Sequence, residues 1–195
     1  IRAGILTDLG VQFDLNDTQL GYINSLAFLG FPVATVFGGL LYNVLGARKL
    51  MIMAFVSHII GLVMTIYAGG FVTLLVSSFF IGFANGSVEA ACNPLIADMY
   101  TRNRTEMLNK FHVWFPGGIV IGAITSKVMS DFGLGWESQI AIMLIPTLIY
   151  GYLFFKEEFP ESEHIETDTS VNFQSLFNPL FLFVVAFLFV YFMFS

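Results

Sequence analysis

Polar residues at helical spacing interrupt an apolar stretch of the chain between residues 85 and 118. Asn85, Glu89 and Asn93 follow one another every four residues, so on a helix they form one polar stripe. In a helix surrounded by hydrocarbon, a lone carboxylate costs roughly 3 kcal/mol on insertion scales. Glu89 is therefore the sharpest candidate for a functional residue. The alternative is a structural acid that is paired with a neighbouring helix.

A second polar group follows in the next apolar segment. Asn109 and His112 lie one turn apart near its start, and Trp114 and Phe115 come just before a helix-disturbing Pro-Gly-Gly sequence. Carboxylate and amide groups pair with vicinal hydroxyls, and an aromatic face covers the apolar side of a sugar ring. The set fits a sugar or similar polyol without requiring one, and His112 can equally be an interfacial histidine. The candidate substrate-binding residues are Asn85, Asn93, Asn109, His112, Trp114 and Phe115.

The composition indicates an integral membrane protein. The chain is 56% hydrophobic, 16% aromatic and only 11% charged, and its mean hydropathy is +0.79, which lies outside the range of soluble domains. The net charge of -6 comes largely from one short stretch, because six of the 14 carboxylates fall between residues 157 and 168. The acidity therefore belongs to a linker and not to a surface.

Several function classes are excluded or unsupported. The single Cys92 rules out an intrachain disulfide and C-x-x-C spacing, and no H-E-x-x-H, G-x-S-x-G or P-loop motif is present. No basic face favours nucleic acid. We therefore expect neither an enzyme nor a bound metal or cofactor.

Apolar runs define the helices that must hold these residues. Residues 50–88 contain no Asp, Glu, Lys or Arg, which is too long for one crossing of a core about 30 Å thick and suits two, with a break at residues 68–70. The sequence predicts an all-α membrane bundle with a helix remnant before residue 13, helix-capping residues at 14–18, and six spans. The spans are 19–42, 50–68, 71–99, 111–130, 137–155 and 176–195.

This segmentation gives a domain organisation. Residues 1–156 form a transmembrane helix bundle, 157–175 an acidic linker, and 176–195 the first helix of a second bundle. The chain opens without an initiator Met and ends inside an apolar run, so we expect a fragment of a longer protein.

The basic residues predict the orientation in the membrane. Short loops rich in Lys and Arg stay in the cytoplasm, and the clusters here are each separated by two spans, so they fall on one side. The loops at 43–49 and 99–110 and the linker are thus predicted to be cytoplasmic, in a plasma or inner membrane. The residues concerned are Arg48, Lys49, Arg102, Arg104, Lys110 and Lys156.

Three motifs resemble one known family. Glu89-Ala-Ala-Cys-Asn93-Pro94 is similar to the Glu-x-x-x-Asn-Pro of a fourth helix, and Leu108-Asn109 with the aromatic and Gly-Ala pattern through Gly122-Ala123 is similar to a fifth. The stretch from Gly39 to Lys49 resembles the loop between helices two and three. The family is the major facilitator superfamily, and within it the fucose, galactose and glucose proton symporters. The resemblance covers nearly the whole chain, as the six-helix first half, the central linker and the seventh helix.

The resemblance implies alternating access, in which two bundles rock about a midplane site, with Glu89 taking part in proton coupling. A family acidic residue of the first helix falls at about Ala3 here. The family's Gln and Asn on the fifth helix fall at about His112 and Phe115, and Asn43 replaces the usual Asp of the loop motif.

Two function hypotheses follow. In the first, the chain is part of a secondary active transporter that moves a small polar solute, most simply a sugar, together with protons; its partners are then the solute, the lipid bilayer and the missing C-terminal half. In the second, it is a sensor or assembly protein that keeps the bundle without transporting.

Several further residues have structural expectations. His58 is expected to hydrogen-bond within the bundle, and Trp136 to sit in an interfacial aromatic belt. Close helix packing is expected at five glycines, Gly38, Gly39, Gly117, Gly118 and Gly122.

Overall fold

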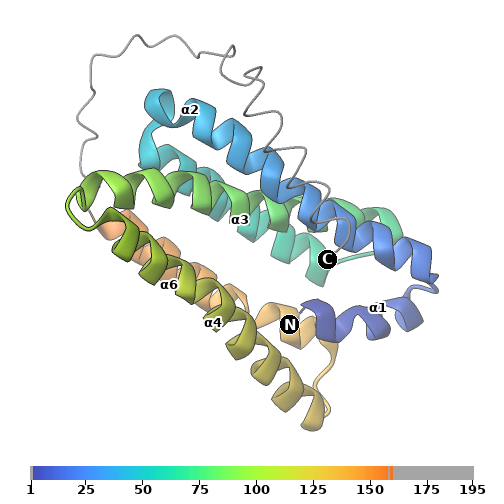
Figure 1. Cartoon of the computed structure of the whole chain (residues 1–195). Helices are drawn as coiled ribbons and strands as arrows, with labels where there is room; N and C mark the ends of the chain where they lie inside the picture. The colour runs from blue at the N-terminus through green and yellow to red at the C-terminus, as the bar shows by residue number, and fades with distance from the viewer. Residues whose placement is uncertain (1, 158, 160–195) are drawn as a thin grey trace. The chain divides into compact units, whose positions relative to one another are not determined.

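The structure is a computed structural model that describes residues 2–157 and 159 (Figure 1). The contacts divide the chain into two units, residues 1–163 and 164–195, and every described residue belongs to the first. Most of the predicted linker, residues 157–175, and the predicted span 176–195 lie outside the described residues.

Every regular element in the described part is a helix. Four stretches are long and apolar enough to cross a membrane, namely α2, α3, α4 and the stretch Trp136–Lys156 that combines α5 and α6. The prediction of an all-α membrane protein is therefore confirmed. The elements are η1 (Arg2–Ile5), α1 (Leu6–Gln12), α2 (Asp17–Ile66), α3 (Phe71–Met99), α4 (Arg104–Asp131), α5 (Trp136–Ala141) and α6 (Leu144–Lys156).

The long helix α2 consists of two helical segments that meet at Gly46. Gly46 has φ 74° and ψ 164°, a conformation that a residue without Cβ adopts readily. The prediction of a loop at 43–49 is therefore wrong, because the chain is helical on both sides of Gly46 and only Gly46 departs from helical geometry. The predicted loop at 99–110 is likewise reduced to residues 100–103, because α4 begins at Arg104.

Local signals at two other helix boundaries agree with the sequence. At the start of α2, Asn16 Oδ1 accepts a hydrogen bond from the backbone N–H of Gln19 at 2.9 Å, and the Gln19 side chain accepts one from the Asn16 N–H at 3.0 Å. This reciprocal pair is a capping box. Between α2 and α3, the chain turns at residues 67–70, where the glycine break was predicted.

Helix α3 packs against both segments of α2. Ala27, Phe31 and Gly38 of the first segment lie beside Gly82, Gly86 and Ala90 of α3 in the same chain direction. In the second segment the order is reversed, because Met51, His58 and Thr65 contact Cys92, Asn85 and Ser77. The first segment is thus parallel to α3 and the second antiparallel. Figure 1 shows the three lying side by side.

Small residues make this contact close. A Cβ built on Gly82 would clash with the carbonyl oxygen of Ala27, and one on Gly38 would lie 2.6 Å from the Ala90 Cβ. Lipid tails are as apolar as Leu, so membrane helices associate through such van der Waals contact and not through the hydrophobic effect. The packing expectation is confirmed for Gly38. It is wrong for Gly39, Gly117 and Gly118, because no described atom lies within 4 Å of a Cβ built at any of them.

A hydrophobic cluster forms where α1 and α5 pack against α2 and α3. Trp136 is only 4% exposed and packs with Ile5, Leu9 and Leu74. Its indole Nε1–H donates to Gln12 Oε1, and its ring lies 6.0 Å from that of Phe13. The prediction of an interfacial belt position for Trp136 is therefore wrong, because α1 covers it.

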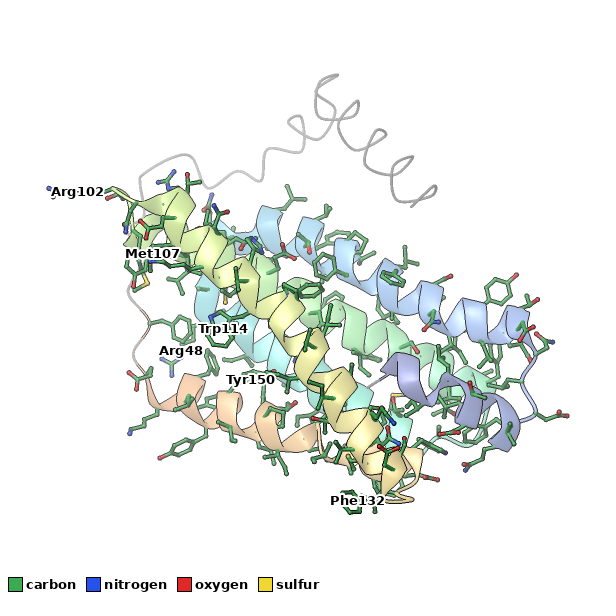
Figure 2. The ribbon with its side chains drawn as sticks, turned by 60° about the horizontal axis from the view of Figure 1, so that its bottom comes forward. Arg48, Arg102, Met107, Trp114, Phe132 and Tyr150 are labelled. Carbon is green, nitrogen blue, oxygen red and sulfur yellow. The ribbon has the colours of Figure 1, made fainter. Side chains whose placement is uncertain are left out.

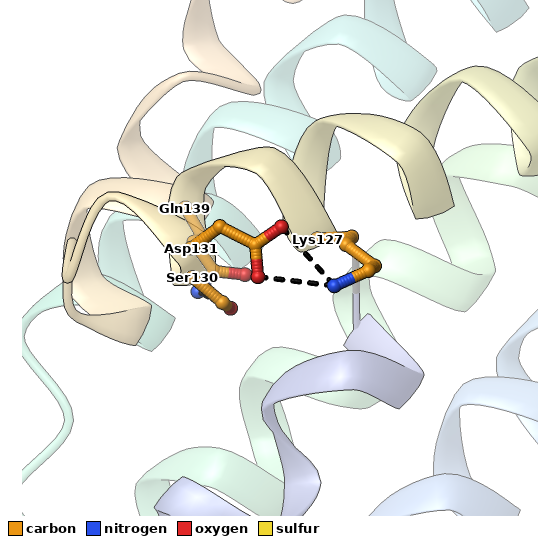
Figure 3. A network of polar contacts seen from close by, with 4 residues as sticks. All are labelled: Lys127, Ser130, Asp131 and Gln139. Atoms are coloured by element: carbon orange, nitrogen blue, oxygen red, sulfur yellow. Dashed lines mark hydrogen bonds and ion pairs between the residues drawn. The ribbon is translucent and has the colours of Figure 1, made fainter.

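Polar side chains join the end of α4 to α5. Ser126 Oγ donates to Gln139 Oε1 at 2.6 Å, and Gln139 Nε2 donates to Ser130 Oγ at 3.1 Å. Beside them, Lys127 Nζ forms an ion pair with Asp131 at 3.0 Å (Figure 3). Only this end of α4 carries buried residues, Ser126 and Met129.

We expect Gly82→Ala to lower the free energy of unfolding by about 1–3 kcal/mol, the usual cost of overpacking, because the new methyl group meets backbone that cannot move aside alone. Thermal unfolding of the purified protein would measure it. Gly39→Ala is the matched control: nothing lies within 4 Å of a Cβ there, so the helix preference of Ala should leave stability unchanged or raise it by up to about 1 kcal/mol. Equal effects at both sites would contradict close packing at Gly82.

Candidate functional site

The predicted stripe lies along α3. Asn93 Nδ2 donates to Glu89 Oε1 at 3.4 Å, and both side chains are half-buried, whereas Asn85 is exposed. The Asn93 Oδ1 atom is buried and has no hydrogen-bond partner within the described part of the chain. The stripe therefore offers a carboxylate and an amide oxygen that the surrounding helices leave largely unused.

A proline adds a backbone acceptor to the same helix. Pro94 lies inside α3 and has no N–H, so the carbonyl of Ala90, four residues earlier, lacks its usual helical donor. Such a free carbonyl, one turn from Asn93, can accept a hydrogen bond from a ligand.

The second segment of α2 contributes the described imidazole closest to the stripe. His58 Nε2 lies 3.0 Å from Asn85 Oδ1 on α3, and His58 Nδ1 lies 2.8 Å from the hydroxyl oxygen of Tyr150 on α6. The expectation that His58 hydrogen-bonds within the bundle is confirmed. Tyr150 was not predicted, because it is 92 residues from His58 along the chain and nothing in its apolar surroundings marks it.

The α4 half of the predicted site is arranged differently. Asn109, His112, Trp114 and Phe115 are all exposed, Trp114 to 75%. His112 makes an edge contact with the neighbouring Phe111 ring at 5.4 Å. Within the described residues, no hydrogen bond or ring contact links these four to the stripe on α3. The structure thus gathers Asn85, Glu89 and Asn93 but does not bring the α4 residues to them.

The chain reverses direction at Gly46 and again at residues 100–103, and both reversals, which carry basic residues, lie at one end of the helical bundle. Figure 2 shows Arg48 and Arg102 at that end and Phe132 at the other. At the basic end, Arg104 Nε donates to the carbonyl of Ala97 at 3.0 Å, which satisfies an acceptor in the last turn of α3.

An apolar helical bundle with a carboxylate and amides along one helix defines a multi-pass membrane protein with a polar site. The chain belongs to the major facilitator superfamily, whose sequence pattern matches residues 3–195. The family-level resemblance is thereby confirmed.

Individual relatives are more distant. The chain is 23% identical over 150 residues to a D-xylose transporter of Levilactobacillus brevis, with 76% of this chain and 33% of the relative covered. It is 26% identical over 155 residues to a cis,cis-muconate transport protein of Acinetobacter baylyi, an alignment that covers 77% of this chain and 36% of the relative. It is 26% identical over 165 residues to a hexuronate transporter of Bacillus subtilis, an alignment that covers 80% of this chain and 39% of the relative. The chain thus spans about a third of these relatives. No solved structure matches it significantly.

We expect Asn93→Leu to leave the free energy of unfolding unchanged or raise it by up to about 1 kcal/mol. Removing a buried polar atom without a partner, which costs roughly 1–3 kcal/mol, is partly offset by loss of the long hydrogen bond from Asn93 Nδ2 to Glu89. Unfolding of the purified complete protein would measure this change. A matched control is Thr65→Val, since Thr65 Oγ1 contacts Gly61 O at 2.8 Å and Ser77 Oγ at 3.0 Å; that variant should lose about 1 kcal/mol. Destabilisation by Asn93→Leu would mean that the Asn93 oxygen is paired in the complete protein.

Proposed function

We propose that this chain forms part of a secondary active transporter that moves a small polar solute, a sugar or similar polyol, together with protons. Transport proceeds by alternating access, with the described helices forming one side of the solute path. Glu89 takes part in proton coupling. Asn85 and Asn93 contact the solute, and Asn109, His112, Trp114 and Phe115 join them there in a different state of the transport cycle.

The electrostatic surroundings of Glu89 carry this proposal. In the described part of the chain the ion pairs are Lys110–Glu106 and Lys127–Asp131, so Glu89 has no cation beside it there. Its one hydrogen bond to a described residue, from Asn93, is long at 3.4 Å. A structural acid would be expected to have a partner cation or several short hydrogen bonds. A carboxylate with so few contacts in the described part of the chain is the candidate we assign to proton coupling.

The relatives support the solute class. Those named for D-xylose and hexuronate carry solutes with several hydroxyl groups, and the hexuronate and muconate relatives carry carboxylates. The closer likeness to fucose, galactose and glucose proton symporters stays a prediction that rests on the Glu-x-x-x-Asn-Pro sequence.

We expect Glu89→Gln to abolish proton-driven accumulation while preserving exchange of solute across the membrane, because Gln keeps the shape and hydrogen bonding but holds no titratable proton. The complete protein, expressed from its full reading frame, would be reconstituted in proteoliposomes with D-xylose and D-glucuronate as first probes. Glu106→Gln is the control, since Glu106 is exposed and paired with Lys110 at 2.7 Å.

Unchanged proton coupling in Glu89→Gln would remove Glu89 from this role. Solute binding without flux in the unaltered protein would instead favour the non-transporting sensor.

A separate prediction is that the end of the bundle with Arg48 and Arg102 faces the cytoplasm. Single cysteines placed at Arg102 and Phe132, in a Cys92→Ser background, should react from opposite sides of the membrane with an impermeant thiol reagent, position 102 from the cytoplasm. The positions are suitable because both are exposed. Labelling of position 102 from outside would reverse the proposed orientation.

A further inference from the structure

Three helices meet at one set of polar side chains, His58 of α2, Asn85 of α3 and Tyr150 of α6. The imidazole lies between the other two, 3.0 Å from the amide oxygen and 2.8 Å from the phenol oxygen. The His58 and Tyr150 rings are also in edge contact, with centroids 5.8 Å apart. The set is made by packing and not by neighbours in sequence.

The directions of the hydrogen bonds follow from the chemistry of the groups. An amide oxygen only accepts, so His58 Nε2 must carry the proton and donate to Asn85 Oδ1. A neutral imidazole has one N–H, so Nδ1 must accept, and the Tyr150 hydroxyl donates to it. A doubly protonated ring here would be a charge in hydrocarbon facing two neutral partners, which is costly.

This chain of bonds leaves one group unused. With its oxygen held by His58, the Asn85 side chain turns its NH2 group away, and no hydrogen bond from that nitrogen is made to any described residue. Asn85 is exposed, and Glu89 follows one turn later along the stripe. The face therefore presents two N–H donors and then a carboxylate.

The two ends of an amide have nearly the same shape, so packing alone does not fix which one faces outward. The relay ties this choice to the ring proton: with Nε2–H, a flipped Asn85 would set its N–H against the N–H of His58. A flipped Asn85 requires an Nδ1–H ring that donates to the Tyr150 oxygen, and the Tyr150 hydroxyl proton is then left without a partner among the described residues.

We propose that His58 and Tyr150 are positioning residues for solute recognition: they hold the Asn85 amide with its two N–H donors toward the solute path. The solute recognised there carries an oxygen that accepts hydrogen bonds, a hydroxyl, carbonyl or carboxylate. This inference rests on the proposed transport function for its solute, but the relay itself can be tested without transport.

The first experiment measures the ring protons. The complete protein, labelled with 15N-histidine and placed in lipid nanodiscs, gives separate nitrogen resonances for protonated and unprotonated ring positions, and His58→Gln assigns the His58 signals by their loss. We expect Nε2 protonated and Nδ1 unprotonated. The opposite tautomer, or a doubly protonated ring, would overturn the relay.

The second experiment is a double-mutant cycle on solute uptake. Without the imidazole, Asn85 can sample three χ1 wells and two amide orientations, so His58→Leu should raise the apparent KM on the order of sixfold with little change in maximal rate. Tyr150→Phe frees only the amide orientation and should raise KM about twofold. His58→Gln should restore the unaltered value within about twofold, because a Gln amide can donate to Asn85 and accept from Tyr150.

The cycle is closed by Asn85→Ala. If His58 and Tyr150 act through Asn85, neither substitution should change KM further in that background. Additive effects would mean that they act on the solute path independently and would overturn the inference. If neither D-xylose nor D-glucuronate is bound or carried, the proposed function fails for these solutes, and the tautomer measurement alone decides the relay.

Discussion

The contact between the backbones of α2 and α3 is the constraint on which the other features depend. At Gly82 and Gly86 no side chain separates α3 from the carbonyls of Ala27 and Phe31. In a bilayer this contact replaces the hydrophobic effect as the source of association, because lipid competes equally for apolar side chains. Since α3 is held on one side by the first segment of α2 and on another by the second, the direction of its polar stripe is fixed by packing. Because packing prevents α3 from rotating about its axis, the polar side chains of the stripe can remain without hydrogen-bond partners.

In this chain, sequence patterns predict the positions of the helices more reliably than they predict which residues from different helices are in contact. The apolar runs, the capping pair at Asn16 and the break at residues 68–70 are local features, and each is found where it was predicted. Trp136 and Tyr150 are different. A membrane helix is apolar on its lipid face and on its packed face alike, so periodicity does not reveal which face is buried. The partner of Trp136 is Gln12, 124 residues away.

The same limitation explains the candidate site. The spacing of Asn85, Glu89 and Asn93 predicts a shared face because all three are on one helix, and the structure agrees. Placing His112 beside them required a guess about how α4 packs on α3. In the structure α4 is attached through Ser126 and Met129 near its end, while its middle turns are exposed. Two helices adjacent in sequence therefore share a site only if their middle turns are in contact.

The reversal at Gly46 has a consequence for how the chain can change. Ordinary surface loops accept inserted residues, epitopes and protease sites because their backbone is exposed and little contacts it. At Gly46 there is no such loop: one glycine separates two helices that both pack on α3. The reversal at residues 100–103, at the same end of the molecule, is a short exposed turn. The two reversals at this end therefore differ in the insertions they can accept: added residues can be accommodated after Met99 but not around Gly46.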